Sequence, residues 1–250
     1  MANRGAGLTS EPGGWEYAGA RAGRPYVLLS AAVSLDGYLD DDSPNRLVLS
    51  DDDDWDRVDA LRAGADAIMV GANTVRRDNP RLLVRSAERR ADRVARGVAP
   101  NPARVTVSAG GGLDPAARIF GDEADTLVYR PAGAQNRDPS GARVEVVDLP
   151  RGAAMPAAVA GDLFRRGVRR LMIEGGQRIH TAFLLAGLVD EIQIVTAPFL
   201  VGAAGAPRFV GPGRFPRGPG RPMRLAELRR INDLVLARYL LDEPTAAGGG

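Results

Sequence analysis

The sequence predicts an α/β protein of one domain, with a mixed and mostly parallel sheet flanked by helices and a C-terminal antiparallel hairpin. Three observations support this prediction. The chain has 250 residues and 44% hydrophobic content, enough for the core of a single domain. Short β-rich apolar runs alternate with helical patterns over most of it, as in parallel βα units. Two further apolar runs flank Asn232 and Asp233, as in a hairpin.

Composition marks the limits of this domain. Residues 1–23 are rich in glycine and alanine, so we expect them to be disordered, although Trp15 and Tyr17 provide side chains that could dock on the body. The alternating pattern fills residues 24–242, which form the predicted domain. Residues 243–250 are expected to be a flexible tail.

The first helix has the clearest signals. It follows an expected strand at 26–33, takes Ser50 as its N-cap and continues to about residue 63. Aspartates at 51–54 lie in its first turn, where negative charge complements the helix dipole. Its predicted apolar stripe consists of Trp55, Val58 and Leu61.

The rest of the domain repeats short strands and helices. Strands are expected at 67–70, 105–107, 126–129, 144–147, 170–173 and 191–196. Helices are expected at 86–97, 155–166 and 178–186, the first of them an arginine-rich surface insertion. A loop rich in Gly and Pro covers 211–221, and the hairpin pairs 225–231 with 234–241.

The composition excludes several kinds of chemistry. The chain has no lysine and no cysteine, so it lacks a Schiff-base lysine, a P-loop, a thiolate nucleophile and a cysteine zinc site. The single histidine, His180, cannot form a two-histidine metal motif, and its place in a helix favours a structural role. The acidic runs at 40–42 and 51–54 match no calcium loop, so no metal is expected.

The same composition limits partners and location. A formal net charge of +2 gives no reason to expect nucleic acid as a partner. No apolar run is long enough to span a membrane, and no signal pattern begins the chain. We therefore expect a cytoplasmic protein. Because the chain lacks the side chains named above, we also expect a bound cofactor to supply the reactive group of any demanding reaction.

One candidate site follows the strand at 170–173, where Glu174, Gly175 and Gly176 open a helix. Paired glycines let a backbone approach a phosphate, and the helix N-terminus supplies free N–H donors. A tight βα turn that needs glycine is the simpler alternative. The carboxylate of Glu174, at the end of an apolar strand, needs a partner or a ligand, which favours a site.

A second candidate site follows the strand at 67–70, where Gly71 leads into a short turn. Thr74 and Asp78 are four residues apart, so in a helical turn they share a face and could hold a ribose or an amide. Alternatively, Thr74 is a cap and Asp78 a turn former before Asn79. Two such strand ends in one small domain indicate one nucleotide cofactor held across a crevice.

Two arginines could bind a phosphorylated ligand. Arg62 lies near the end of the first helix, and Arg85 ends the run at 82–84. With 33 basic residues in the chain, a solvated surface arginine is the simpler interpretation of each alone. Their interest lies in acting as a pair of guanidinium forks on phosphate. Asp36 and Gly37, after the first strand, form a turn.

Taken together, the motifs resemble a known family. They are 34–37 (SLDG), 61–71 with its Leu-Arg-Ala and Asp-Ala-Ile-Met-Val-Gly runs, 74–82, 174–176 (EGG), and 187–191 followed by Ala197 and Pro198. In this order they resemble the reductase domain of riboflavin biosynthesis, which has a dihydrofolate-reductase-like fold. The resemblance covers about residues 24–241. Zinc deaminase domains are often fused to bacterial members, and because the chain is short and has no cysteine we expect no such domain here.

The resemblance implies an NADPH-dependent reductase of a phosphorylated ribosylamino-pyrimidine, of the 5-amino-6-(5-phosphoribosylamino)uracil reductase type, which converts a ribosyl to a ribityl group. It also implies a homodimer. Alternatives are a reductase of another heterocycle, such as a pterin, or a nucleotide-binding protein without catalysis.

The resemblance also assigns roles to residues. The cofactor positions are Ala32, Val33, Leu47, Thr74, Asp78, Ser108, Gly175, Gly176, Gln177, Arg178 and Ile179. The substrate positions are Asn45, Arg62, Leu82, Arg85 and Glu174, with the two arginines facing the phosphate and Glu174 as the catalytic position that orients the substrate. Asn45 and Leu47 stand where some members have a serine and a tryptophan.

Overall fold

The computed structural model describes residues 15, 18–19, 21–43, 45–108, 112–134, 139, 141–150, 152 and 154–241. The strands in this part of the chain are β1 (Tyr26–Ser34), β2 (Ala67–Gly71), β3 (Ala103–Val107), β4 (Thr126–Pro131), β5 (Val144–Leu149), β6 (Arg170–Gly175), β7 (Glu191–Ala197), β8 (Arg224–Ile231) and β9 (Leu234–Leu240). Several extend one or two residues beyond the predicted runs, because residues at their ends also pair with neighbouring strands.

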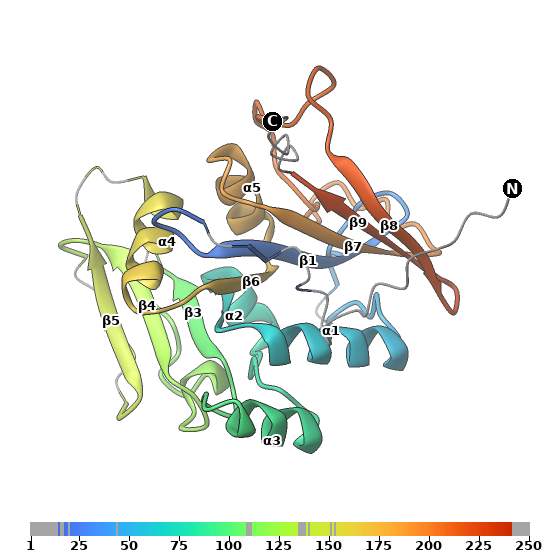
Figure 1. The fold of residues 1–250 in the computed structure, drawn as a ribbon. Helices are drawn as coiled ribbons and strands as arrows, with labels where there is room; N and C mark the ends of the chain where they lie inside the picture. Colours follow the sequence, from blue (N-terminus) through green and yellow to red (C-terminus); the bar gives the residue numbers. More distant parts are fainter. Residues whose placement is uncertain are drawn as a thin grey trace, which may run out of the picture.

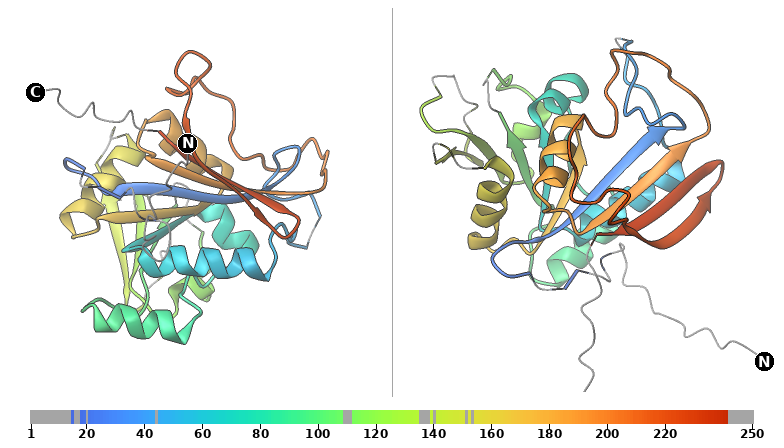
Figure 2. Two further views of the ribbon diagram at one scale, coloured as in Figure 1. Left: turned by 45° about the vertical axis from the view of Figure 1, so that its right-hand side comes forward. Right: turned by 90° about the horizontal axis from the view of Figure 1, so that it is seen from above.

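In the described residues, nine strands form one sheet in the order β5-β4-β3-β2-β6-β1-β7-β9-β8 (Figure 1). Strands β1 to β7 pair in parallel, whereas β9 runs antiparallel to both β7 and β8. The predicted fold class, with its closing hairpin around Asn232 and Asp233, is therefore confirmed. Figure 2 shows this hairpin at one end of the sheet and β5 at the other.

Helices cover both faces of the sheet (Figure 1). On one face lie α4 (Met155–Arg165) and α5 (Gln177–Leu185), packed on β-strand side chains such as Leu29 and Met69. On the other lie α1 (Asp52–Gly64) and α2 (Ala72–Asp78), with α3 (Ala87–Ala95) against α1. Alternate residues of β1 and β2 point to opposite faces, so each strand contributes to both cores.

Helix α1 corrects two predictions. Its N-cap is Asp51, which accepts a hydrogen bond from the Asp54 N–H, and not Ser50. Trp55, predicted to face the core, is 40% exposed, whereas the carboxylates of Asp54 and Asp59 are buried. The apolar spacing identified Leu61 and the partly buried Val58 correctly, but it could not show that Asp54 and Asp59 are buried in ion pairs with Arg57 and Arg89.

Two segments expected at the surface contribute to the interior. In α3, the guanidinium group of Arg93 is buried and donates to the carbonyl groups of Ala63 and Ala65 at the end of α1. Within the segment predicted to be disordered, Trp15 is only 2% exposed and its Nε1–H donates to the Leu61 carbonyl at 2.9 Å. Tyr17 and the tail at 243–250 lie outside the described residues.

Candidate functional site

The carboxyl ends of four neighbouring strands form the edge on which the predicted site depends. Strands β3, β2, β6 and β1 are adjacent and parallel, so their ends meet at the same edge of the sheet. Val70 pairs with Gly175 across β2 and β6, next to the two candidate turns. Ligands of open α/β sheets bind at this edge, where the loops after the strands meet.

The two candidate turns are in direct proximity. A Cβ atom built on Gly176 would lie 3.0 Å from the Thr74 hydroxyl, and one on Gly175 would lie 3.7 Å from it. Gly176 also has φ of +100°, a backbone conformation that favours glycine. Gly71 is the N-cap of α2, so the alternative prediction that Thr74 is a helix cap is wrong. The two turns, far apart in the chain, therefore lie together. We call the surface formed by Thr74, Gly175 and Gly176 the cradle.

Helix α5 approaches this cradle closely. A Cβ atom on Gly71 would lie 2.9 Å from Ile179 Cγ1, so β2 and α5 can pack this tightly only because residue 71 is glycine. The Ile179 side chain belongs to the core, and its N–H donates to the Gly176 carbonyl at 2.9 Å, so both groups are already engaged within the protein. Arg178 is exposed and Gln177 is half-buried in the same first turn.

Glu174 and Arg62 form a bidentate ion pair. The Nε–H and Nη2–H groups of Arg62 donate to the two carboxylate oxygens of Glu174, each at 2.6 Å, and Nη1–H donates to the Leu83 carbonyl at 3.1 Å. Burial opposes the charge on Arg62, but the attraction and hydrogen bonds of Glu174, together with the attraction of Asp59, raise the pKa of the guanidinium above its usual value. The sequence placed both residues at the substrate; the structure shows that they also bind each other.

Asp78 lies at the end of α2 beside a charged loop. Burial raises the pKa of Asp78, and neighbouring Asp40 adds to this while Arg46 and Arg77 oppose it. Asp40 forms an ion pair with Arg77 at 2.7 Å and accepts the Leu47 N–H at 3.0 Å. Through these contacts the loop that carries Asn45 and Leu47 is held against α2, near Asp78.

Other predicted cofactor positions lie along the same edge. Ala32 and Val33 are near the end of β1, and Ser108 follows β3. The Ser108 hydroxyl is buried and, within the described residues, has no hydrogen-bond partner. A buried hydroxyl without a partner at a ligand edge is consistent with a group that a bound molecule would satisfy.

Leu82 and Arg85 lie on the segment that runs beside α1. Leu82 is buried with φ of +52°, whereas Arg85 is exposed. The Asp59 carboxylate accepts the N–H groups of Arg85 at 2.5 Å and Ser86 at 3.1 Å. Asp59 was not singled out from the sequence. The available signal was its position between Val58 and Leu61 of the predicted apolar stripe, because a carboxylate near the core needs a buried partner.

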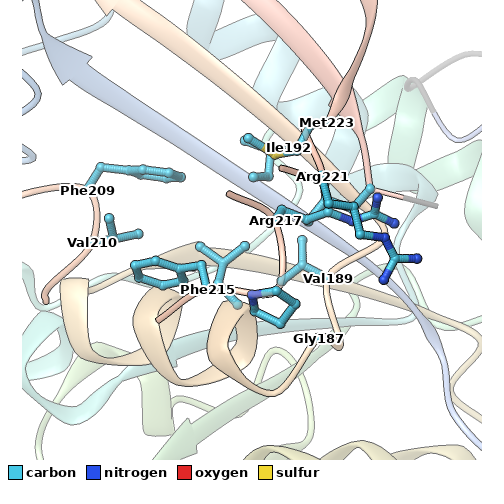
Figure 3. Close-up of a pocket in the computed structure, with 12 residues that line it drawn as sticks. Gly187, Val189, Ile192, Phe209, Val210, Phe215, Arg217, Arg221 and Met223 are labelled. Atoms are coloured by element: carbon cyan, nitrogen blue, oxygen red, sulfur yellow. The ribbon is translucent and has the colours of Figure 1, made fainter. Parts of the chain in front are cut away.

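A cavity of about 370 Å³ lies away from the strand ends, between α5, β7 and the loop at 209–223 (Figure 3). Over the described ranges, no group of three acidic or histidine side chains is placed to hold a metal ion. In the same part of the chain, no helix is both long and apolar enough to cross a membrane.

Comparison with known proteins identifies the family of this chain. The RibD C-terminal domain family matches residues 25–236, most of the chain. The chain belongs to this family. The resemblance inferred from the motifs is thereby confirmed.

Members of the RibD C-terminal domain family similar to this chain include named reductases. The "2,5-diamino-6-ribosylamino-4(3H)-pyrimidinone 5′-phosphate reductase" of Archaeoglobus fulgidus is 42% identical over 86% of this chain and 99% of its own length. The protein of the same name from Methanothermobacter thermautotrophicus is 36% identical over 75% of this chain and 84% of its length. A solved pyrimidine reductase-like protein of Corynebacterium diphtheriae has the same fold, with a TM-score of 0.73, 24% identity, and coverage of 88% of this chain and 93% of that one.

Proposed function

We propose that this protein is an NADPH-dependent reductase of 2,5-diamino-6-ribosylamino-4(3H)-pyrimidinone 5′-phosphate, which converts the ribosyl group to a ribityl group in riboflavin biosynthesis. The observation that carries the proposal is the position of Glu174, which lies immediately before the Gly175–Gly176 turn that Thr74 closes. A carboxylate oriented by Arg62 thus adjoins a cradle suited to a dinucleotide. Relatives at 42% and 36% identity carry the name of this reductase.

The reaction requires little covalent chemistry from the protein. The open-chain form of the substrate has a C=N bond at sugar C1, which becomes CH₂–NH when C1 gains a hydride and the nitrogen gains a proton. NADPH, when bound, supplies the hydride and its electron pair. This chain has no lysine or cysteine to supply a nucleophile, so its own part is to bind, orient and exclude water.

Glu174 is the residue proposed to orient the substrate. Arg62 donates to both carboxylate oxygens of Glu174 and so fixes the orientation of this carboxylate beside the cradle. Each carboxylate oxygen can accept a second hydrogen bond, so hydroxyl or N–H groups of the substrate could bind Glu174 without displacing Arg62. Asn45 and Leu82 are proposed as further substrate contacts.

Three features support a dinucleotide at the cradle. Gly176 leaves open the space that a Cβ atom would fill, α5 begins at Gln177 with free N–H groups, and the Ser108 hydroxyl is buried without a described partner. Ala32, Val33, Leu47, Asp78 and the first turn of α5 are proposed to complete the site. NADPH rather than NADH is the proposed cofactor, in keeping with exposed Arg178 near the turn.

A direct test is single-turnover oxidation of NADPH by the purified protein, followed by dihydronicotinamide absorbance. The diamino-pyrimidinone phosphate should be reduced with a higher kcat/KM than 5-amino-6-(5-phosphoribosylamino)uracil, which has an oxo group in place of the 2-amino group. Glu174→Gln keeps the shape of the side chain and should lower kcat/KM at least a hundredfold. No turnover of either compound at any protein concentration would reject the substrate class.

A homodimer is proposed on the apolar face of the β8–β9 hairpin. Leu225, Leu228 and Val235 lie on the same side of the sheet as α5 and are 50%, 65% and 45% exposed. The cavity of Figure 3 adjoins this face, with Phe209, Phe215 and Met223 along its walls and Arg217 and Arg221 at one end. Exposed apolar surface of this kind marks a contact with another molecule. The cytoplasmic location and the dihydrofolate-reductase-like assignment stay predictions.

A further inference from the structure

One face of α1 carries an aromatic ring, a carboxylate and a guanidinium group in line. Trp55, Asp59 and Arg62 are spaced i, i+4 and i+7, so they lie one above another on the helix. All three contact the segment at 83–86: Arg62 binds the Leu83 carbonyl, Asp59 binds the Arg85 N–H, and Trp55 lies under the Arg85 side chain. This face of α1 therefore carries Arg62 and contacts Arg85, the two arginines assigned to the substrate phosphate.

We propose that Trp55 is a positioning residue that holds the Arg85 guanidinium where it binds the phosphate of the substrate. The inference rests on the proposed function and adds a residue that the family motifs do not include. The Arg85 Cζ atom lies 5.9 Å from the centre of the Trp55 ring, within the range of a cation–π contact.

The backbone of Arg85 is already fixed. Its N–H donates to Asp59, and its carbonyl accepts from Arg90 Nη1 at 2.6 Å. Asp59 is itself held by Arg89 at 3.1 Å. These contacts place the Cα atom of Arg85 but leave the direction of its long side chain open, and the Trp55 ring is what restricts it.

The charges around Arg85 favour an anion from outside the protein. Arg62 is engaged by Glu174, and Arg89 by Asp56 and Asp59. Among the described residues no carboxylate pairs with Arg85, so its fork is available for a phosphate dianion.

The exposure of Trp55 supports the same role. The other tryptophan, Trp15, is 2% exposed and fills the core, whereas Trp55 is 40% exposed and belongs to none of the core clusters of the described residues. An indole in this position, beside an arginine without a counter-charge, is unusual for a structural residue, because 40% of its surface remains in water.

Fluorescence tests the inference without turnover. In Trp15→Phe, only Trp55 emits, and ribose 5-phosphate should change its emission with a saturable dependence that ribose does not show. Arg85→Ala in the same background should abolish the change. In Trp55→Phe, Trp15 emission should not respond, which keeps the test valid if Trp15→Phe fails to fold. Calorimetric binding of ribose 5-phosphate without any change in Trp55 emission would overturn the inference.

Kinetics separate positioning from a structural role. Trp55→Leu should raise KM for the phosphorylated substrate about two- to fivefold, the size of an exposed cation–π contact, with kcat unchanged, and Trp55→Phe should restore most of the loss. Neither variant should affect the dephosphorylated substrate. Arg165→Ala, a distant exposed arginine on α4, is the charge control.

The outcomes also separate this inference from the proposed function. Normal KM in Trp55→Leu together with a raised KM in Arg85→Ala would overturn the role of Trp55 and leave the reductase assignment intact. Absence of turnover in the unmodified protein, with phosphate-dependent Trp55 emission still present, would reject the substrate and retain the phosphate site.

Discussion

The Thr74 hydroxyl lies 3.0 Å from the position that a Cβ atom on Gly176 would take. The two residues come from turns after β2 and β6, more than a hundred residues apart in the chain, and they meet because these strands are parallel neighbours. A side chain at position 176 would both strain the backbone and enter the space assigned to the cofactor. A substitution of Gly176 is therefore the most direct test of whether the cradle binds the cofactor.

Gly176→Ala should lower NADPH affinity at least tenfold, because the methyl group would crowd Thr74 and the backbone has φ of +100°. The matched control is Gly167→Ala, with φ of +94° and nothing within 4 Å of the added Cβ atom. Both variants should lose about 1 kcal/mol or somewhat more of unfolding free energy from backbone strain. Fluorescence titration with NADPH checks the difference, and equal affinities in the two variants would contradict the cradle.

Arg62 and Arg85 should have separable roles, because only Arg62 is paired with Glu174. Arg62→Ala leaves that carboxylate without its partner, so kcat should fall at least tenfold even on a dephosphorylated substrate. Arg85→Ala should raise KM for the phosphorylated substrate at least tenfold and leave the dephosphorylated one unaffected. Steady-state kinetics on both substrates distinguish these patterns, and matching effects of the two variants would show that both arginines act only on phosphate.

Sequence patterns were sufficient for the strands and for the place of the site. Apolar runs ending at Gly71 and Glu174 identified β2 and β6, and the rule that parallel strand ends share an edge predicted that Thr74 and Gly176 would meet. These features depend on local composition and on a general property of α/β sheets, so they can be predicted from a single sequence.

The polar contacts between distant segments could not be predicted in the same way. Arg62 pairs with Glu174 across 112 positions, and Asp59 binds the backbone at Arg85 across 26. Among 33 basic residues, nothing local distinguishes a buried arginine such as Arg104, whose guanidinium donates to Thr126 and to nearby carbonyl groups, from a solvated one. Such pairs can be identified only from the three-dimensional structure, which shows both partners together.

His180 should make the protein less stable in acid. Its Nδ1 is 3.0 Å from the Phe209 carbonyl and must donate to it, while Nε2 is buried without a described partner. Burial lowers its pKa from 6.5 to about 4, so the neutral ring is favoured in the folded state. Its contribution to stability is fully present above pH 6.5 and is lost as the pH falls toward 4, with a total of about 3 kcal/mol.

The measurement is urea denaturation of the protein and of His180→Asn between pH 7 and pH 4. Asparagine keeps an N–H donor for Phe209 but does not titrate, so the variant should be less stable at neutral pH and lose less stability on acidification. Parallel pH dependence of the two proteins would show that carboxylates alone account for the acid sensitivity.

Leu228→Glu should convert the proposed homodimer to a monomer. Leu228 is 65% exposed on the apolar face that also carries Leu225 and Val235, and burying a glutamate there in a dimer interface would remove its carboxylate from water. Val94→Glu is the control, because Val94 is 57% exposed on α3, on the opposite side of the sheet. Light scattering after size exclusion should show half the mass for the first variant only. A monomeric parent protein, or a dimer that survives Leu228→Glu, would mean that this face does not join two copies.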